Sequence, residues 1–239
     1  MDAPLDRWLA AAGRFILPPR CLACGDRGVG STELCAGCLA ALPWNDRHCA
    51  RCALPLPRET TLCGSCQRAT PSWHAAWVPF RYAAPIDQLE ARFKFHGQLA
   101  AGRTLAHCWL RARCPLDRPD AVVPVPLHVS RLRRRGFNQA LELVKPLARR
   151  IGCPLWPDAL ERVRMTAAQS DLDAAARARN VRGAFAVRRL PAVRHVAVVD
   201  DVMTTGATLE ACARALRDAG VARVDIWALA RTGRDVSSR

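Results

Sequence analysis

The stretch of sequence that decides the fold is Val198-Val199-Asp200-Asp201-Val202-Met203-Thr204-Thr205-Gly206-Ala207-Thr208. Residues 195–199 predict a buried strand, with the two carboxylates at its carboxyl end. A tight turn into a helix should follow, because apolar residues recur with a helical period from Leu209 to Leu216 and Gly220 can cap the end. In open α/β sheets, ligands bind beyond the carboxyl ends of strands. The stretch therefore predicts a ligand site.

The turn has the chemistry of a phosphate site. Backbone amides and hydroxyl groups can surround a phosphate dianion, helped by the positive end of the helix. The residues that supply them are Thr204, Thr205, Gly206, Ala207 and Thr208. Asp200 and Asp201 suit ribose hydroxyls, held directly or through Mg²⁺. A lone Asp-Asp or Thr-Gly pair usually marks only a structural turn, but strand, acids and hydroxyl-rich turn occur here in order, so we expect phosphoribosyl binding.

The chain around this stretch alternates between strand and helix patterns, which predicts an α/β fold with a parallel sheet flanked by helices. Further strands are expected at residues 77–82, 121–125, 184–187 and 224–229. Helices are expected at residues 86–95, 99–113 and 138–150. Asn138 is a good N-cap for the last of these helices, and Pro146 inside it indicates a kink.

A regular array of cysteines precedes the α/β region. Its four Cys-x-x-Cys pairs are Cys21/Cys24, Cys35/Cys38, Cys49/Cys52 and Cys63/Cys66. Two such pairs complete one tetrahedral zinc site, so eight ligands predict two structural Zn²⁺ ions with no open position for catalysis. A weak internal repeat of 28 residues, in which Thr32 and Leu34 match Thr60 and Leu62, favours sequential pairing. A disulfide scaffold would need a secretory signal, and a redox motif would need a single pair.

Composition sets the remaining expectations for this chain of 239 residues. A net charge of +15 favours a polyanionic partner such as nucleic acid, although an arginine-rich solvated surface would give the same balance. No signal-type or bilayer-length apolar run is present, so we expect a cytoplasmic protein without membrane insertion. We divide the chain into a packing helix at 1–20, a double zinc ribbon at 21–70 and the α/β domain at 71–239.

Several further motifs extend the pattern over nearly the whole chain. They are Val123-Pro124-Val125-Pro126-Leu127, then residues 131–139, then Arg164, Thr166, Gln169, Leu172, Arg179, Asn180 and Phe185. With the zinc ribbon and the 198–208 stretch, they resemble the ComF/GntX family. That stretch itself resembles the 5-phosphoribosyl-1-diphosphate (PRPP) loop of type I phosphoribosyltransferases. The resemblance implies a glycosyltransferase acting on PRPP with Mg²⁺, and a role in DNA uptake during natural competence.

The resemblance also implies roles for individual residues. Residues 125–135 should form the loop that binds the diphosphate, through Arg133, Arg134 and Arg135; a solvated basic turn is the alternative. Residues 162–180 resemble a lid, with candidate contacts from Arg164, Thr166 and Gln169, although a capped surface helix would look similar. Lys94-Phe95 fits the family pattern as a phosphate contact or as packing.

Two functions of different classes remain open at this level. The first is a phosphoribosyltransferase that uses Asp200 and Asp201 as catalytic residues and an acceptor that the sequence does not identify. The second is a competence protein without enzymatic activity, which binds single-stranded DNA or a protein of the uptake machinery and keeps the pocket for sensing or as a vestige. Few aromatic residues accompany the arginines, so base-stacking platforms are not evident.

Overall fold

The computed structural model describes residues 20–29, 32–58, 60–115, 117–164, 181, 183–190 and 192–233. The expected N-terminal helix, apart from residue 20, and the expected lid beyond residue 164 lie outside these residues, and so do Thr166 and Gln169. Within the described residues, no helix has the length and apolar character needed to cross a bilayer.

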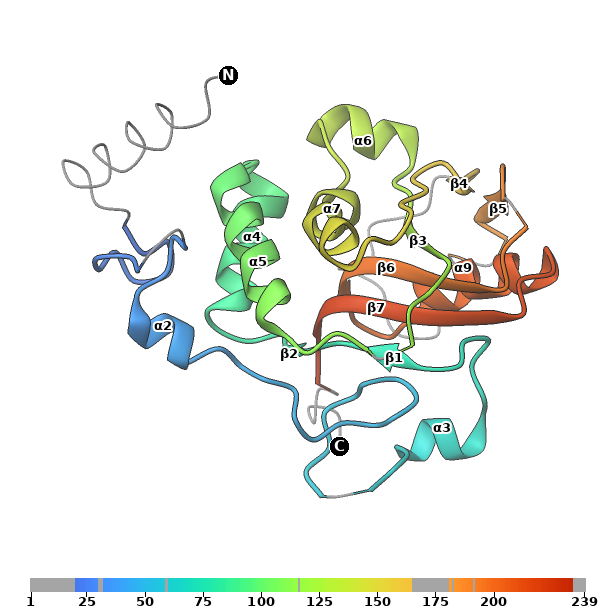
Figure 1. Ribbon diagram of the computed structural model, residues 1–239, viewed down its shortest axis with the longest axis horizontal. Helices are drawn as coiled ribbons and strands as arrows, with labels where there is room; N and C mark the ends of the chain where they lie inside the picture. The colour runs from blue at the N-terminus through green and yellow to red at the C-terminus, as the bar shows by residue number, and fades with distance from the viewer. Residues whose placement is uncertain are drawn as a thin grey trace.

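A parallel sheet forms the centre of the molecule (Figure 1). Its order is β1–β7–β6–β3, and β2 also pairs with β7. The strands are β1 (Ala76–Trp77), β2 (Phe80–Arg81), β3 (Ala121–Pro124), β6 (His195–Met203) and β7 (Arg223–Arg231). Because every pair is parallel, all carboxyl ends lie at one edge of the sheet, where the 198–208 stretch ends its strand.

The expected strand at 77–82 is divided into β1 and β2. Both segments pair with β7 in one continuous register, since Trp77 lies opposite Trp227 and Phe80 opposite Ala230. The interruption falls at Pro79, which has no N–H to donate to a ladder. The carbonyl of Pro79 instead accepts a hydrogen bond from the amide of Asn45, so this edge is covered by the zinc-ribbon region.

Two other strand predictions need correction. β6 continues to Met203, so Asp200 and Asp201 lie within the strand rather than after it; Asp200 pairs with Ala228 of β7, and the pairing resumes at Val202 and Met203. The expected strand at 184–187 forms as β5 (Phe185–Val187), but it pairs antiparallel with β4 (Leu160–Arg162) outside the main sheet. β4 was not predicted.

Helices cover both faces of the sheet. The helices α4 (Ile86–His96), α5 (Leu99–Arg111) and α7 (Gln139–Ile151) pack in sequence on one face, and α9 (Ala207–Asp218) covers the other. Along β6, Ala197 and Val199 belong to the α7 side of the core, whereas Val196 and Val198 belong to the α9 side. This alternation explains the continuous apolar run in the sequence, since a parallel strand is buried on both faces.

The helix expected at 138–150 begins as predicted. Asn138 caps it, with its side-chain oxygen accepting from the amide of Leu141 at 3.4 Å, while its amide nitrogen donates to the carbonyl of Val125 at 3.0 Å. The segment before it differs from expectation. Residues 125–135 are not a loop throughout, because α6 (Val129–Arg135) forms between a cap at His128 and Gly136, whose φ of 84° ends the helix.

The two cysteine groups pack on opposite sides of the domain. Short helices follow the third cysteine of each group, α2 (Ala36–Ala40) and α3 (Gly64–Arg68). Cys21 joins the core with α4 and α5, and Cys49 joins the core with α9. Among the four cysteines outside the array, Cys212 is fully buried on α9, as its place on the apolar face indicates.

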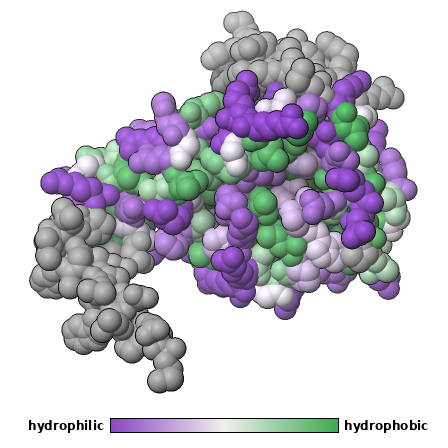
Figure 2. All heavy atoms as spheres, turned by 90° about the horizontal axis from the view of Figure 1, so that it is seen from above, coloured by the Kyte–Doolittle hydropathy of each residue, from purple (hydrophilic) through white to green (hydrophobic). Residues whose placement is uncertain are grey.

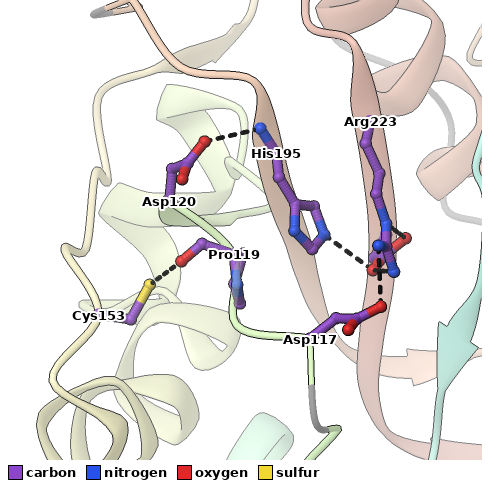
Figure 3. A network of polar contacts seen from close by, with 7 residues as sticks. Asp117, Pro119, Asp120, Cys153, His195 and Arg223 are labelled. Atoms are coloured by element: carbon purple, nitrogen blue, oxygen red, sulfur yellow. Dashed lines mark hydrogen bonds and ion pairs between the residues drawn. The ribbon is translucent and has the colours of Figure 1, made fainter.

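Polar contacts fasten the amino ends of the strands, opposite the acidic pair (Figure 3). The ring of His195 lies 2.8 Å from a carboxylate oxygen of Asp225, which also pairs with Arg223, and Arg223 reaches Asp117 as well. Asp120 accepts the amide of His195 at 2.9 Å, and such amide bonds hold the pKa of Asp120 below its usual range. These contacts align β3, β6 and β7, so this edge is structural.

Candidate functional site

A cavity of about 370 Å³ opens at the carboxyl edge of the sheet. Its size lies within the range of small-molecule sites. The described residues that line it are Tyr82, Lys94, Phe95, Val125, Leu127, Arg131, Arg134, Arg135, Asn138, Gln139, Ala140, Arg162, Asp200, Asp201, Val202, Thr204, Thr208 and Thr232. Strand, turn and helix segments that lie far apart in the sequence therefore meet in one site.

The acidic pair lies at the floor of this cavity. Successive residues of a strand point to opposite faces, so Asp201 faces Lys94 on α4, whereas Asp200 faces the side that holds Arg162 and α9. Asp201 is 8% exposed. Each carboxylate also accepts the amide of the next residue, Asp200 from Asp201 at 2.9 Å and Asp201 from Val202 at 2.7 Å.

Their surroundings separate the two carboxyl groups chemically. Burial and the negative charge of Asp201 raise the pKa of Asp200 well above its usual range. Burial also opposes ionisation of Asp201, but the ammonium of Lys94 and the hydrogen bonds to Asp201 outweigh it and hold its pKa below the usual range. Asp201 therefore ionises more readily than Asp200.

Lys94 is fixed by a second buried acid. Its ammonium lies 3.1 Å from Glu90 and 3.5 Å from Asp201, and the hydroxyl of Tyr82 donates to Glu90 at 3.1 Å. Glu90 is 1% exposed, and burial together with the charge of Asp201 raises its pKa. Attraction to Asp201 raises the pKa of Lys94 against the effect of burial. Lys94 thus joins α4 to the acidic pair, a role that the sequence left undecided.

These contacts of Lys94 predict that substitution of the two lysines of the chain lowers the free energy of unfolding by different amounts. Replacing Lys94 with Met should lower the free energy of unfolding by about 2 kcal/mol, because Asp201 and Glu90 lose a common cation. Lys145→Met should cost less than about 0.5 kcal/mol, since its pair with Glu142 is more than one-third exposed. Urea denaturation measures both changes.

Because the folded pKa of Lys94 lies above its unfolded value, this stabilisation is complete at neutral pH and is lost as the pH rises through the folded pKa. Equal losses in the two variants would contradict the buried ion pair.

The turn that follows β6, residues 204–208, is called the phosphate turn below. Gly206 has a φ of 82°, in the left-handed region that favours glycine because other residues are strained there. The hydroxyl of Thr205 accepts the amide of Ala207 at 3.3 Å and shapes the first turn of α9. Thr204 and Thr208 line the cavity. The turn therefore presents hydroxyl groups to the cavity at the amino end of α9.

The cationic wall differs from the prediction in its members. Arg134 and Arg135 line the cavity together with Arg131, and burial lowers the pKa of both Arg131 and Arg135. Since α6 is helical, residues three and four apart share a face, which selects 131, 134 and 135. Of the described residues predicted for the site, the following lie outside the cavity lining: Arg133, Arg164, Thr205, Gly206 and Ala207.

Several cavity residues were missed from the sequence. Arg162 on β4 lines the cavity, is 6% exposed and lies with its guanidinium 5.3 Å from the ring centre of Phe185. The i,i+4 spacing of Glu90 and Lys94 was a signal for their pairing. No local pattern indicated Arg162, because its strand is short and pairs with a distant segment. Phe95, at the cavity and 71% exposed, was noted only through the family pattern.

The cysteine groups have the geometry of two four-ligand metal sites. The first zinc site groups Cys21, Cys24, Cys35 and Cys38, and the second groups Cys49, Cys52, Cys63 and Cys66. This confirms sequential pairing. The sulfur atoms of each site lie within 4.8 Å of one another, and Cys24–Cys35 and Cys52–Cys63 are each separated by 3.6 Å. A tetrahedron with Zn–S bonds of about 2.3 Å has edges near these values.

The sulfur chemistry also fits a bound cation. Although burial opposes ionisation, backbone hydrogen bonds lower the pKa of Cys21 to about 6 and that of Cys49 to about 7. Burial and neighbouring sulfur atoms raise the pKa of Cys38 and Cys66. A thiolate cluster of this kind is stable when a divalent ion balances its charge. Both sites therefore fit structural Zn²⁺, held by protein ligands alone.

Two family models match separate parts of the chain. A model of the double zinc ribbon domain matches residues 12–67, and a model of the phosphoribosyl transferase domain matches residues 138–238. Competence protein F of Haemophilus influenzae is 36% identical, over 89% of this chain and 96% of its own length. DNA utilization protein YhgH of Escherichia coli K12 is 35% identical, over 85% of this chain and 92% of its own length.

Fold and site thus define a zinc-ribbon protein with a phosphoribosyltransferase domain. The chain belongs to the ComF/GntX family. The expected fold class is confirmed, with a type I phosphoribosyltransferase-like parallel sheet between helices and an N-terminal double zinc ribbon.

Proposed function

We propose that this protein binds PRPP with Mg²⁺ in the cavity at the carboxyl edge of the sheet. The phosphate turn would hold the 5-phosphate, and Asp200 and Asp201 would hold the ribose hydroxyls. Carboxylate and hydroxyl oxygens are also the ligands that Mg²⁺ prefers, so the residues present fit the ion. In this arrangement Mg²⁺ would balance the charge of the diphosphate.

The observation that carries the proposal is the charge pattern of one cavity. Among the described residues, five cationic side chains and two carboxylates line it: Lys94, Arg131, Arg134, Arg135 and Arg162 beside Asp200 and Asp201. Such an excess suits a polyanionic ligand that also carries a polyol. Arg131, Arg134 and Arg135 come from one face of α6 and would take the diphosphate, because guanidinium groups pair with phosphate oxygens in a two-pronged manner.

The same arrangement supports transfer as well as binding. In the reaction, the bond between the anomeric carbon and the diphosphate oxygen breaks, and the electron pair leaves with the diphosphate toward the arginines. A nucleophile with a free electron pair, such as a nitrogen, attacks the carbon from the opposite face and loses its proton. Asp200 and Asp201 would steady the cationic ribose. Catalysis would then rest on positioning and charge stabilisation.

The acidic pair predicts a pH dependence of binding. Mg²⁺ binds the ionised form of Asp200, and the pKa of this carboxyl is raised. Affinity for PRPP with Mg²⁺ should therefore rise with pH until the raised pKa is passed, by up to about tenfold per pH unit. Calorimetric titration at several pH values measures this slope. Asp200→Asn should bind weakly at every pH, and it controls for titration of the ligand itself, so an equal slope in both proteins would contradict the assignment.

The free protein should respond in the opposite sense. Since Asp200 binds its proton more tightly in the folded state, its contribution to stability is lost as the pH rises from the unfolded toward the folded pKa. Asp200→Asn removes that loss and should melt at a higher temperature than the wild type at neutral pH.

A second candidate function is a single-stranded DNA- or partner-binding competence protein that keeps the pocket for sensing or as a vestige. The names of the relatives, a competence protein and a DNA utilization protein, favour it, and so does the net charge of +15. On the face shown in Figure 2, hydrophilic residues are spread among hydrophobic ones, without a continuous band.

A filter-binding titration separates the two functions. Retention of single-stranded DNA by the basic residues should weaken steeply as the salt concentration rises. It should weaken further when residues 133–135 are replaced by Ser. It should be unchanged in Asp201→Asn. Retention that ignores salt would exclude the second function.

A further inference from the structure

The backbone that leads into the phosphate turn accepts hydrogen bonds from a buried arginine. Arg231, the last residue of β7, is 6% exposed. Its guanidinium donates to the carbonyl of Met203 at 2.9 Å and to the carbonyl of Thr204. It also donates to the carbonyl of Thr232 at 3.1 Å. Because these bonds engage carbonyl groups, they fix the path of the chain into the turn while its hydroxyl groups stay directed to the cavity.

The same arginine reaches the second zinc site. Its Nε donates to the carbonyl of Cys52 at 3.2 Å, and Cys52 is a predicted metal ligand. The indole nitrogen of Trp73 donates to the carbonyl of the preceding residue, Arg51, at 2.8 Å. Two consecutive carbonyls of one Cys-x-x-Cys knuckle thus accept from side chains that contact the phosphate turn.

Trp73 completes the connection by packing. A Cβ atom on Gly206 would lie 3.3 Å from the Trp73 ring, so the ring lies directly against the backbone of the turn. The adjacent Ser72 donates its amide and its hydroxyl to Glu210 on the first turns of α9, at 2.9 and 2.6 Å. Met203, Leu209 and the cysteines of the second site belong to one apolar core.

The first zinc site has different partners. Among the described residues, the carbonyl of Leu22 accepts from Arg92 on α4, and Glu33 accepts from Thr104 on α5 at 3.3 Å. Its buried cysteine belongs to the core on the opposite face of the sheet from α9. The two zinc sites are similar in sequence but are attached to different parts of the fold, which provides an internal control.

We propose that Arg231 and Trp73 are positioning residues that connect the backbone of the phosphate turn to the second zinc site. The order of the turn, and with it affinity for a phosphorylated ribose, then depends on zinc at Cys49, Cys52, Cys63 and Cys66 and not on zinc at the first site. The statement on affinity rests on the proposed function, whereas the statement on order does not.

Hydrogen exchange of the full-length protein tests the order of the turn without any ligand. Cys66→Ser and Cys24→Ser each remove one ligand, from the second and the first site. The amides of residues 203–208 should exchange at least about tenfold faster in Cys66→Ser and at the wild-type rate in Cys24→Ser. Equal exchange in both variants, fast or slow, would overturn the proposal.

A milder pair of variants guards against general unfolding. Trp73→Phe keeps an aromatic ring but removes the donor to Arg51, and Trp77→Phe makes the same change in an aromatic cluster on the opposite face. With zinc content verified as unchanged, Trp73→Phe should speed exchange at 203–208 severalfold. No difference from Trp77→Phe would overturn the role of Trp73.

Binding of PRPP with Mg²⁺ is then measured on the same proteins. Affinity should fall about tenfold in Trp73→Phe and Arg231→Lys and be unchanged in Trp77→Phe. If the wild type binds no PRPP while exchange at 203–208 follows the second site, the proposed function fails and the positioning role stands. If the wild type binds and neither exchange nor affinity follows the second site, the positioning role fails and the proposed function stands.

Discussion

Asp201→Asn should reduce affinity for PRPP with Mg²⁺ by about 100-fold, equivalent to about 3 kcal/mol. Asp201 is the member of the pair that is ionised, since Lys94 and the amide of Val202 hold its pKa down. Asparagine has the same shape but cannot offer a charged oxygen to Mg²⁺ or accept two strong hydroxyl bonds. The protein should stay folded, because Lys94 keeps its contact with Glu90 at 3.1 Å.

Isothermal titration calorimetry measures this change, and Asp117→Asn is its control. Asp117 pairs with Arg223 at the opposite edge of the sheet and has a side chain that is 68% exposed, so its substitution should leave affinity unchanged. Wild-type affinity in Asp201→Asn would remove the acidic pair from the site.

Cys49→Ser should have the second large effect, on folding rather than binding. Cys49 is fully buried and supplies one of the ligands of the second site. Structural zinc sites bind with free energies on the order of 10 kcal/mol, as large as the stability of a whole domain. The variant should therefore hold one zinc per chain and lose the cooperative part of its unfolding transition that includes the core around α9.

Elemental analysis with urea denaturation measures both results. Cys21→Ser should likewise retain one zinc, held by the second site, but keep the core around α9 intact. Two zinc ions per chain in either variant would contradict four-cysteine sites with sequential ligands.

Local patterns in the sequence predicted the frame of the site. The buried run at 195–199 and the helical period after it predicted β6 and α9, because a parallel strand and an amphipathic helix each have their own pattern, although β6 extends past the acids to Met203. Asn138 was recognisable as a cap for the same reason. The spacing of the cysteines predicted both four-cysteine groups, and the resemblance named the family to which the chain belongs.

Contacts between distant segments could not be predicted in this way. The role of Arg231 can be seen only in the folded chain, because β7 places this residue against the phosphate turn and beside Cys52, which is far away in the sequence. Because α6 is helical, Arg131 lines the cavity and Arg133 does not, and no pattern in the arginine-rich segment showed which face would line the cavity. β6 extends beyond its apolar run because of contacts with distant segments. Asp200 pairs with β7, and the side chain of Asp201 contacts Lys94 on α4.

Calorimetric titration of PRPP with Mg²⁺ into the wild type and into Thr208→Tyr tests the phosphoribosyl site most directly. Thr208 lines the cavity at the start of α9, so a tyrosine there should occupy the place of the 5-phosphate. We expect saturable binding of one PRPP per chain in the wild type and none in Thr208→Tyr. Absence of binding in the wild type, or equal binding in both proteins, would contradict a phosphoribosyl site in this cavity.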